Sequence, residues 1–291
     1  MAQLLEIKSR IRSVDSTLKI TKAMKMIATA RLARARERFN KVKPVYERIE
    51  NIAQRMSNIE NINQHELFIK RDVKRVLFVV FSTNRGFCGG YNIRLFNYLE
   101  EQKHSFHGKD VFILPIGEKA MEYYDKFDNR INLPIVDEII WENDMFNQSR
   151  LLMYDLKKMY FNSEYDEIYI VYNSFKSILL QKPRIKKILP LEKVEDNDAE
   201  EMDYIFEPKR ELILDNLLDT YLILTINTAL IELETGEYGA RMSAMDGANR
   251  NGEKLTKKLK IQFQRARQEA ITREITEIIG GAETLRREKD E

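Results

Sequence analysis

The sequence predicts an α/β protein in which an open, mainly parallel, Rossmann-like sheet domain is inserted between two long helices that pair as an antiparallel coiled coil. Three observations carry this prediction: a long apolar series at each end of the chain, and alternating strand and helix patterns between them. An apolar spacing that averages about 3.5 residues keeps one seam of a helix facing a partner. Because an inserted α/β domain has its ends close together, the two helices of one chain are each other's nearest partners.

The first helix is expected from about residue 3 to about residue 61. Only Thr21 and Lys25 interrupt its seam, and Pro44 predicts a kink or local bend. The seam consists of Leu4, Ile7, Ile11, Val14, Leu18, Ala28, Leu32, Ala35, Phe39, Val42, Tyr46, Ile49, Ala53 and Met56.

The middle of the chain changes from helical spacing to short apolar runs that alternate with short helices. Such alternation is typical of parallel strands joined by helical crossovers. A glycine-rich turn, STNRGFCGGYN at 82–92, follows the first run and opens a helix that ends near residue 104. The expected strands are 73–81, 111–116, a weaker 133–140, 167–173 and 184–189, and the further helices are 118–127 and 145–161.

The second long helix is expected from Pro208, which suits a first helical turn, to Gly280 and Gly281, which suit a C-terminal stop. An acidic stretch without apolar periodicity, 191–203, precedes it and reads as a mobile loop. Its softer seam consists of Leu217, Tyr221, Leu224, Ile231, Tyr238, Met242, Met245, Leu259, Phe263, Ala266 and Ala270.

Composition limits the function classes. The 291 residues carry a net charge of only +2, although 32% of them are charged. The first helix is strongly basic, so its polar face is either simply solvated or meets an acidic partner or nucleic acid. No apolar run approaches the roughly 20 residues that span a bilayer, and no signal or transit segment is recognised, so the protein is expected to be soluble or held at a membrane by partners.

Candidate chemistry is sparse. The segment 85–90, RGFCGG, lies where a phosphate-binding turn would lie, yet it matches neither the dinucleotide fingerprint nor a P-loop, and a tight strand-to-helix turn explains it. The lone Cys88 excludes a disulfide framework and favours a reducing compartment. It is a nucleophile only if His65, His104 or His107 folds beside it, and a packed thiol is the simpler reading. No metal-ligand spacing, cofactor motif or catalytic constellation is present.

Four stretches carry a likeness to a known family. Residues 20–28, ITKAMKMIA, and 261–281, IQFQRARQEAITREITEIIGG, resemble signatures of the gamma subunit of F-type ATP synthases. The turn at 82–92 and YIFEP at 204–208 resemble that family's central turn and the end of its inserted domain. The likeness covers essentially the whole chain in order.

What the resemblance implies is a rotor that is not itself an enzyme. In the family, the helical pair stands inside the hexamer of alpha and beta subunits, and the inserted domain sits on the c-ring with the epsilon subunit. Proton-driven rotation then changes the nucleotide affinity of each beta site. The implied location is the cytoplasmic side of a bacterial inner membrane, peripheral and reached only through partners. No cofactor, metal or nucleic acid is implied.

The resemblance also implies contact residues. Met24 and Lys25 match a position close to the acidic lever loops of beta, and Arg241, Arg267 and Gln268 match positions that pair with other beta loops. Ile275, Ile278 and Ile279 would form a bearing in an apolar sleeve, and Tyr204 and Glu207 would belong to the foot on the c-ring.

Several departures from the family pattern matter. Asn84 replaces a frequent Asp, and Gly247 and Gly252 replace alanine, which costs a helix about 1 kcal/mol each and predicts a softer shaft. The charged tail is expected to emerge beyond the sleeve, and the cysteine-bearing insertion of the chloroplast relatives is absent. The expected parts are an N-terminal helix (1–61), an inserted domain (73–207), a C-terminal helix (208–285) and the tail (286–291).

Two other functions stay open at this point. A basic coiled-coil protein that binds nucleic acid would show strong salt dependence, although aromatic residues on the first helix are few and lie mostly in the seam. A nucleotide-dependent enzyme built on RGFCGG would need a general acid, a base and a phosphate-binding lysine, which the motif lacks.

Overall fold

The structure is a computed structural model that describes the chain except residues 1, 58–61, 63–64, 134–143, 194–209 and 291, and omits the side chains of 2–3, 210–212, 281 and 283–290. It divides into two compact units. The helical unit comprises residues 1–27 and 242–291, and the sheet unit comprises residues 28–241.

Two long helices frame the chain, as the sequence predicts. The first, α1 (Ala2–Met56), continues across Pro44, and the second, α6 (Arg210–Asp290), is the longest element. The inserted elements are β1 (Arg75–Phe81), α2 (Tyr91–Lys103), β2 (Asp110–Ile116), α3 (Glu118–Tyr123), α5 (Met145–Phe161), β3 (Glu167–Phe175) and β4 (Gln181–Leu189), with single 3-10 turns at Glu66–Phe68 and His104–Phe106.

The sheet has the order β2-β1-β3-β4. Strand β1 pairs in parallel with β2 and with β3, and β4 closes one edge by antiparallel pairing with β3. The chain therefore leaves β1 first toward one edge and later returns to its other side. In open α/β sheets such a reversal creates a crevice at the carboxyl ends of the strands, where ligands usually bind.

Alternate residues of the central strand face two separate cores, as a strand covered on both sides requires. Helices α2 and α3 cover one face, whereas α5, α6 and α1 cover the other. The first core contains Val76, Phe78, Val80, Leu95, Phe96, Leu99 and Ala120, and the second contains Leu77, Val79, Leu152, Leu156, Tyr160, Leu222, Ile226 and Leu230.

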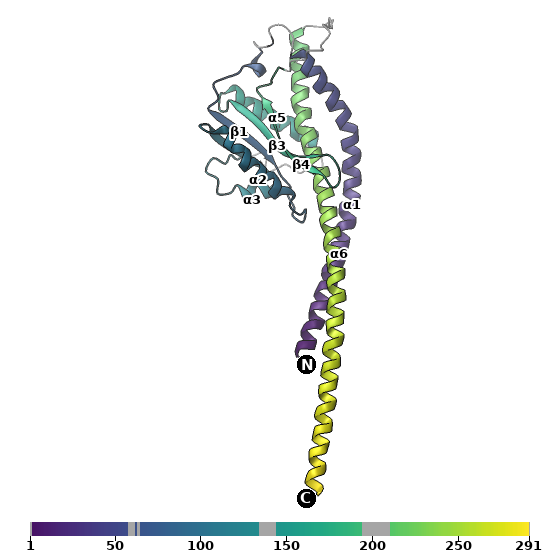
Figure 1. Ribbon diagram of the computed structural model, residues 1–291. Helices are drawn as coiled ribbons and strands as arrows, with labels where there is room; N and C mark the ends of the chain where they lie inside the picture. The colour runs from purple at the N-terminus through teal and green to yellow at the C-terminus, as the bar shows by residue number, and fades with distance from the viewer. Residues whose placement is uncertain (1, 58–61, 63–64, 134–143, 194–209, 291) are drawn as a thin grey trace. The chain divides into compact units, whose positions relative to one another are not determined.

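Within the sheet unit α1 and α6 run side by side, and the predicted seam is confirmed (Figure 1). Ala28, Leu32 and Ala35 of α1 are at most 5% exposed. Basic residues beside the seam pair across it: Arg38 Nη2 lies 2.6 Å from Glu234 Oε1 on α6. Part of the basic face of α1 therefore has its acidic partner within the same chain.

In the helical unit the two residues that interrupt the α1 seam meet polar residues of α6. The hydroxyl of Thr21 lies 2.5 Å from Oδ1 of the buried Asn249. Lys25 Nζ lies 2.6 Å from Asp246. A polar layer of this kind fixes the register of a coiled coil, because a shifted pairing would leave buried polar atoms without partners.

Some predicted boundaries are wrong. Strand β1 begins at Arg75 rather than at 73, and α3 ends at Tyr123, four residues early. Gly280 and Gly281 do not stop α6, because the residues after them are good helix formers and the helix continues to Asp290. The predicted end of the first helix at 61, almost all of the strand at 133–140 and most of the acidic loop lie outside the described residues. The predicted domain limits stay a prediction.

No helix in the described segments combines enough length with enough apolar character to cross a membrane.

Candidate functional site on the long helices

The carboxyl edge of the parallel strands is occupied by a segment of α6, Glu232–Arg241, which we call the docking segment. Glu232 Oε2 accepts a hydrogen bond of 3.0 Å from the backbone N–H of Phe175, the last residue of β3. The hydroxyl of Tyr91, at the start of α2, donates to the carbonyl oxygen of Leu233 at 3.0 Å. A Cβ on Gly236 would lie 2.7 Å from that hydroxyl oxygen, so glycine permits the close approach.

Arg241 ends the docking segment and holds the glycine-rich turn. Its Nε and Nη2 donate to the carbonyl oxygen of Gly86 at 3.2 and 3.1 Å, and Nη2 also donates to the carbonyl oxygen of Arg85 at 3.2 Å. The same guanidinium lies 2.5 Å from Glu237 Oε1, and its side chain is only 9% exposed. The planar fork of arginine suits several acceptors at fixed positions.

The turn therefore presents carbonyl oxygens to an arginine rather than N–H groups to an anion, which argues against a phosphate site. Cys88 is buried, as predicted, and burial raises the pKa of its thiol. The candidate histidines have other neighbours, since His65 lies 2.8 Å from Asp215 and His104 packs beside His107. An enzyme with Cys88 as its nucleophile would need one of these histidines beside the thiol, and the contacts that they make are with other residues.

Two carboxylates belong to the docking segment: Glu232 is buried and Glu237 is half-buried. Burial raises the pKa of Glu232, although hydrogen bonds from Ser174 and Phe175 oppose the shift. Burial also raises the pKa of Glu237, against the charge of Arg241. Sequence reasoning missed both residues. The available signal was acidic residues at 232, 234 and 237 within a stretch that is otherwise apolar or small.

Met24 and Lys25 lie on α1 in the helical unit, where both side chains are half-buried. The ion pair with Asp246 lowers the pKa of that carboxyl group. The neighbouring Ile20, Met26 and Ile27 are more exposed, at 60%, 74% and 57%. From the sequence, Met26 was interpreted as packing on or beside the seam, which its exposure shows to be wrong, and Ile20 and Ile27 were not singled out. Their positions off the seam, within the same motif, were the signal that could have found them.

The end of α6 carries the remaining candidates. Arg267 and Gln268 are exposed, and so are Ile275, Ile278 and Ile279, at 51%, 66% and 60%. At 3.6 residues per turn, a step of four from Arg267 reaches Ile271, and steps of four and seven from Ile271 reach Ile275 and Ile278 on the same face. That face differs from the seam of Phe263, Ala266 and Ala270, which are half-buried. The candidates therefore form one continuous apolar and polar stripe.

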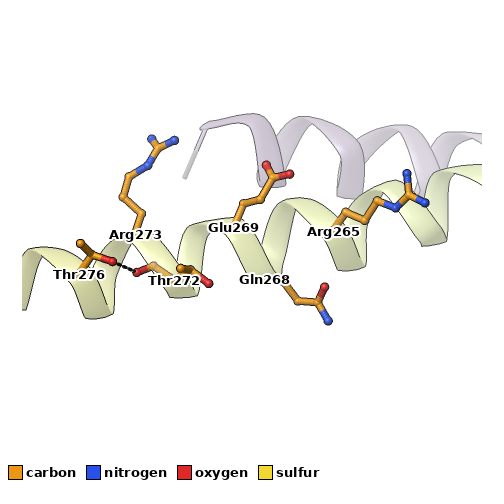
Figure 2. A pocket seen from close by; sticks show the side chains of 6 residues that line it. All are labelled: Arg265, Gln268, Glu269, Thr272, Arg273 and Thr276. Carbon is orange, nitrogen blue, oxygen red and sulfur yellow. Dashed lines mark hydrogen bonds between the residues drawn. The ribbon is translucent and has the colours of Figure 1, made fainter.

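A shallow hollow of about 520 Å³ lies along this part of α6. Figure 2 shows that Glu269 and Gln268 point to opposite sides of the helix, with Arg265 and Arg273 on the side of Glu269. Thr276 donates to the carbonyl oxygen of Thr272. All lining residues come from one helix, which is a side-chain groove rather than an enclosed ligand cavity.

Tyr204 and Glu207, the expected foot, lie outside the described residues. Asn84 caps a helix instead of carrying charge, because its Oδ1 accepts from the backbone N–H of Glu118 at the start of α3. Among the residues that the structure describes, no group of three or more His, Cys, Asp or Glu side chains could hold a metal ion.

Comparisons with known proteins agree with the helical architecture. The family model described as ATP synthase matches residues 3–285. An ATP synthase gamma chain of Desulforamulus reducens is 36% identical over 98% of this chain and 100% of its own length, and one of Geobacter sp. strain M21 is 35% identical with the same coverage.

Solved structures show the same fold. The rotor of the Euglena gracilis mitochondrial ATP synthase matches with a TM-score of 0.68 and 19% identity, over 93% of this chain and 99% of that one. The central stalk and c-ring structure from Tetrahymena thermophila matches with a TM-score of 0.55, over 79% and 99% of the two chains. On the family model and the full-length relatives, the chain belongs to the ATP synthase gamma chain family, the non-catalytic stalk subunits of that enzyme.

Proposed function

We propose that this chain is the central-stalk rotor of an F-type ATP synthase and couples rotation of a proton-driven c-ring to conformational change at the beta-subunit sites. The observation that carries the proposal is the stripe on the end of α6, where exposed isoleucines follow Arg267 and Gln268 on one helical face. A soluble helix rarely leaves such a face without a partner. Full-length similarity to ATP synthase gamma chains supports the hexamer of alpha and beta subunits as that partner.

The stripe has two parts with different tasks. Ile275, Ile278 and Ile279 form the bearing, because an apolar surface offers contact without directional bonds and so resists rotation little. Arg267 and Gln268 supply directional contacts to beta, since a guanidinium makes charge-assisted hydrogen bonds with carboxylates.

A second contact region lies on α1, where Met24 and Lys25 meet the acidic lever loops of beta. Lys25 is paired with Asp246, yet both side chains are partly exposed, at 42% and 35%. A pair as exposed to solvent as this one contributes little to stability, so Lys25 can exchange Asp246 for a carboxylate of beta at little cost. The exposed Met26 and Ile27 add apolar surface beside it.

Arg241 was expected in the same group of beta contacts. Its guanidinium is committed within the chain to the turn and to Glu237. We therefore assign it a role within the rotor. Tyr204 and Glu207 keep the proposed place at the c-ring and epsilon, and the complex is proposed to lie on the cytoplasmic side of a bacterial inner membrane.

Reconstitution tests the function. The purified chain is mixed with alpha and beta subunits, and ATP hydrolysis is compared with that of alpha and beta alone. We expect the chain to enter the complex and to raise the hydrolysis rate. A chain that neither assembles nor stimulates would reject the rotor. A truncated chain ending at Ala270 is the matched control for the bearing, and we expect weaker stimulation from it.

Within the assembled complex, Arg267→Ala is expected to lower turnover roughly tenfold, because a lost charge-assisted hydrogen bond typically costs about 1.5 kcal/mol. Assembly should change little, since the side chain is exposed and contacts one loop of a large interface. Steady-state hydrolysis measures the first effect and gel filtration the second. Lys257→Ala, an exposed charge elsewhere on α6, serves as control. Equal turnover in both variants and the wild type would remove Arg267 from the contact.

A further inference from the structure

The docking segment of α6 makes a small number of hydrogen bonds to the sheet domain. The part of α6 that precedes it makes a large apolar contact with the same domain. Leu222, Ile226 and Leu230 of α6 are completely buried against the sheet core. Apolar packing of this kind is strong but non-directional, and it resists separation better than it resists small slips or rotations of a helix. Hydrogen bonds have preferred angles and lengths, so they define the register in which the two surfaces meet.

Arg241 is the strongest of these directional links. Its fork makes three hydrogen bonds to two consecutive carbonyl oxygens of the turn. Glu237, one helical turn earlier, accepts from the same Nη2 and helps to orient the guanidinium. The guanidinium also lies 5.8 Å from the ring of Tyr238, whose hydroxyl accepts from Arg31 of α1 at 3.2 Å. One network therefore reaches α1, α6 and the turn between β1 and α2.

The turn that Arg241 holds is itself under backbone strain. Phe87 has a φ of 63°, a left-handed conformation that is uncommon for an aromatic residue, and its side chain is 70% exposed. Residues in such conformations persist only where the surroundings hold them. Thr83 Oγ1 donates to the carbonyl oxygen of Arg85 from within the turn, and Arg241 holds the same carbonyl from outside it.

We propose that Arg241 is a positioning residue for rotary coupling: its fork locks the β1–α2 turn to α6, so that force applied to the sheet domain reaches the helix without slip. The inference rests on the proposed rotor function. Lysine cannot replace arginine here, because a single ammonium group cannot satisfy two carbonyl oxygens and Glu237 with the geometry of the fork. A simple charge contact with an acidic partner, by contrast, would tolerate lysine.

The single cysteine of the chain reports on this lock. Cys88 lies in the locked turn, is 4% exposed, and accepts from Asn92 Nδ2 at 3.8 Å. In the full-length chain, we expect Arg241→Lys to raise the rate of Cys88 modification by a thiol reagent at least roughly tenfold, as the loss of one or two hydrogen bonds implies. Arg250→Lys is the matched control, because Arg250 is 72% exposed on the same helix. If Cys88 in a folded Arg241→Lys chain is modified at the wild-type rate, the proposal is overturned.

A coupling assay separates positioning from mere structure. In reconstituted membranes, Arg241→Lys is expected to keep ATP hydrolysis within about twofold of the wild type and to pump several-fold fewer protons per ATP. An unchanged ratio of pumping to hydrolysis also overturns the proposal. Failure of the rotor function is distinguishable, because the wild-type chain would then fail to assemble.

A second variant covers the case in which Arg241→Lys does not fold. Glu237→Gln keeps an acceptor near the guanidinium and leaves the turn contacts sterically intact, but removes the charge that orients the fork. We expect it to raise Cys88 labelling and lower pumping per ATP by less than Arg241→Lys would. Wild-type values for Glu237→Gln in both assays, together with an unfolded Arg241→Lys, would mean that Arg241 serves stability alone.

Discussion

Gly252 and Gly247 look alike in the sequence but have different surroundings in the helical unit. A Cβ on Gly252 would lie 2.6 Å from Leu18 Cδ2 and 3.0 Å from its Cγ, whereas a Cβ on Gly247 would meet nothing within 4 Å. The sequence predicted that both glycines soften the shaft. For Gly252 that prediction is incomplete, since the missing side chain lets a seam leucine of α1 approach α6 closely.

The two glycines form a matched pair of tests. Gly247→Ala is expected to stabilise the chain by up to about 1 kcal/mol through helix propensity. Gly252→Ala is expected to lose that gain and to cost about 1 kcal/mol or more, because Leu18 must repack. Urea denaturation followed by helical circular dichroism measures both. Equal stabilisation by both substitutions would show that the approach of Leu18 carries no packing energy.

Glu232 gives the docking segment a pH dependence. Its pKa is raised in the folded chain, so its contribution to stability is fully present below its pKa in the unfolded chain and is lost as pH rises through the folded value. Lys176 and Arg184 oppose the shift and Tyr172 lies nearby. We expect Glu232→Gln, which keeps the acceptor for Phe175, to be more stable than the wild type at neutral pH.

That advantage should shrink as the pH falls toward the ordinary range of a glutamate. Unfolding midpoints at neutral pH and near pH 5 provide the comparison. A difference in stability that is constant with pH would mean that Glu232 titrates normally.

Glu50 affects stability in a different pH range. Burial opposes ionisation there, but hydrogen bonds from Lys186 and Tyr46 lower its pKa, and its contribution is lost only as the pH falls below the ordinary value.

At the scale of elements, β4 fastens the sheet to both long helices. Lys186 Nζ lies 2.6 Å from Glu50 of α1 and also bonds Tyr46. It sits 5.1 and 5.4 Å from the ring centroids of Tyr46 and of Tyr221 on α6, which stack on each other. An edge strand is ordinarily a site for unwanted pairing. In this protein the Lys186 side chain of the edge strand β4 instead contacts the two long helices.

Lys186→Met is therefore expected to destabilise the sheet unit by about 2 to 4 kcal/mol, because it leaves the partly buried Glu50 without its charged partner. Lys182→Met, an exposed position on the same strand, is the control and should change stability by less than about 0.5 kcal/mol. Chemical denaturation measures the free energy of unfolding of both variants. If both variants lose the same stability, strand propensity rather than the Lys186 cluster is responsible.

The elements also show what a single sequence can predict. Helix α5 has the predicted limits, and the predicted cores of β1 and β3 are correct, because apolar periodicity is a local property. The position of Arg241 could not be predicted, since its partners lie 155 and 156 residues away. The predicted helix end at Gly280 was wrong for a different, local reason. A glycine ends a helix only where the following residues leave the helical path, and these residues continue it.

At the scale of the whole molecule, burial along α6 decreases toward the C-terminus. Residues 225–236 are all buried, residues 252–270 contain a seam of buried or half-buried positions, and residues 271–280 are all exposed. A helix without tertiary contacts is only marginally stable in water. The stability of this molecule is therefore concentrated near its sheet, and its exposed end depends on what surrounds it.

Hydrogen exchange tests that gradient. In the isolated chain, amides at 271–290 are expected to exchange within seconds to minutes, while those at 225–236 stay protected near the limit of global unfolding. In the complex with alpha and beta subunits, the exposed end should gain protection of at least roughly tenfold, as burial of its isoleucines in a sleeve requires. Unchanged exchange on assembly would remove the bearing from residues 271–280.

The pairing of α1 with α6 also sets a problem for biosynthesis. Arg31 and Tyr238, which touch across the two helices, are separated by 207 residues. At about 5 to 20 residues per second, the ribosome needs roughly 10 to 40 seconds to deliver the second after the first. Throughout that interval the apolar seam of a finished α1 has no partner from its own chain. Nascent copies of this protein are thus natural clients for chaperones, and neighbouring copies on one messenger RNA are candidates for mispairing through that seam.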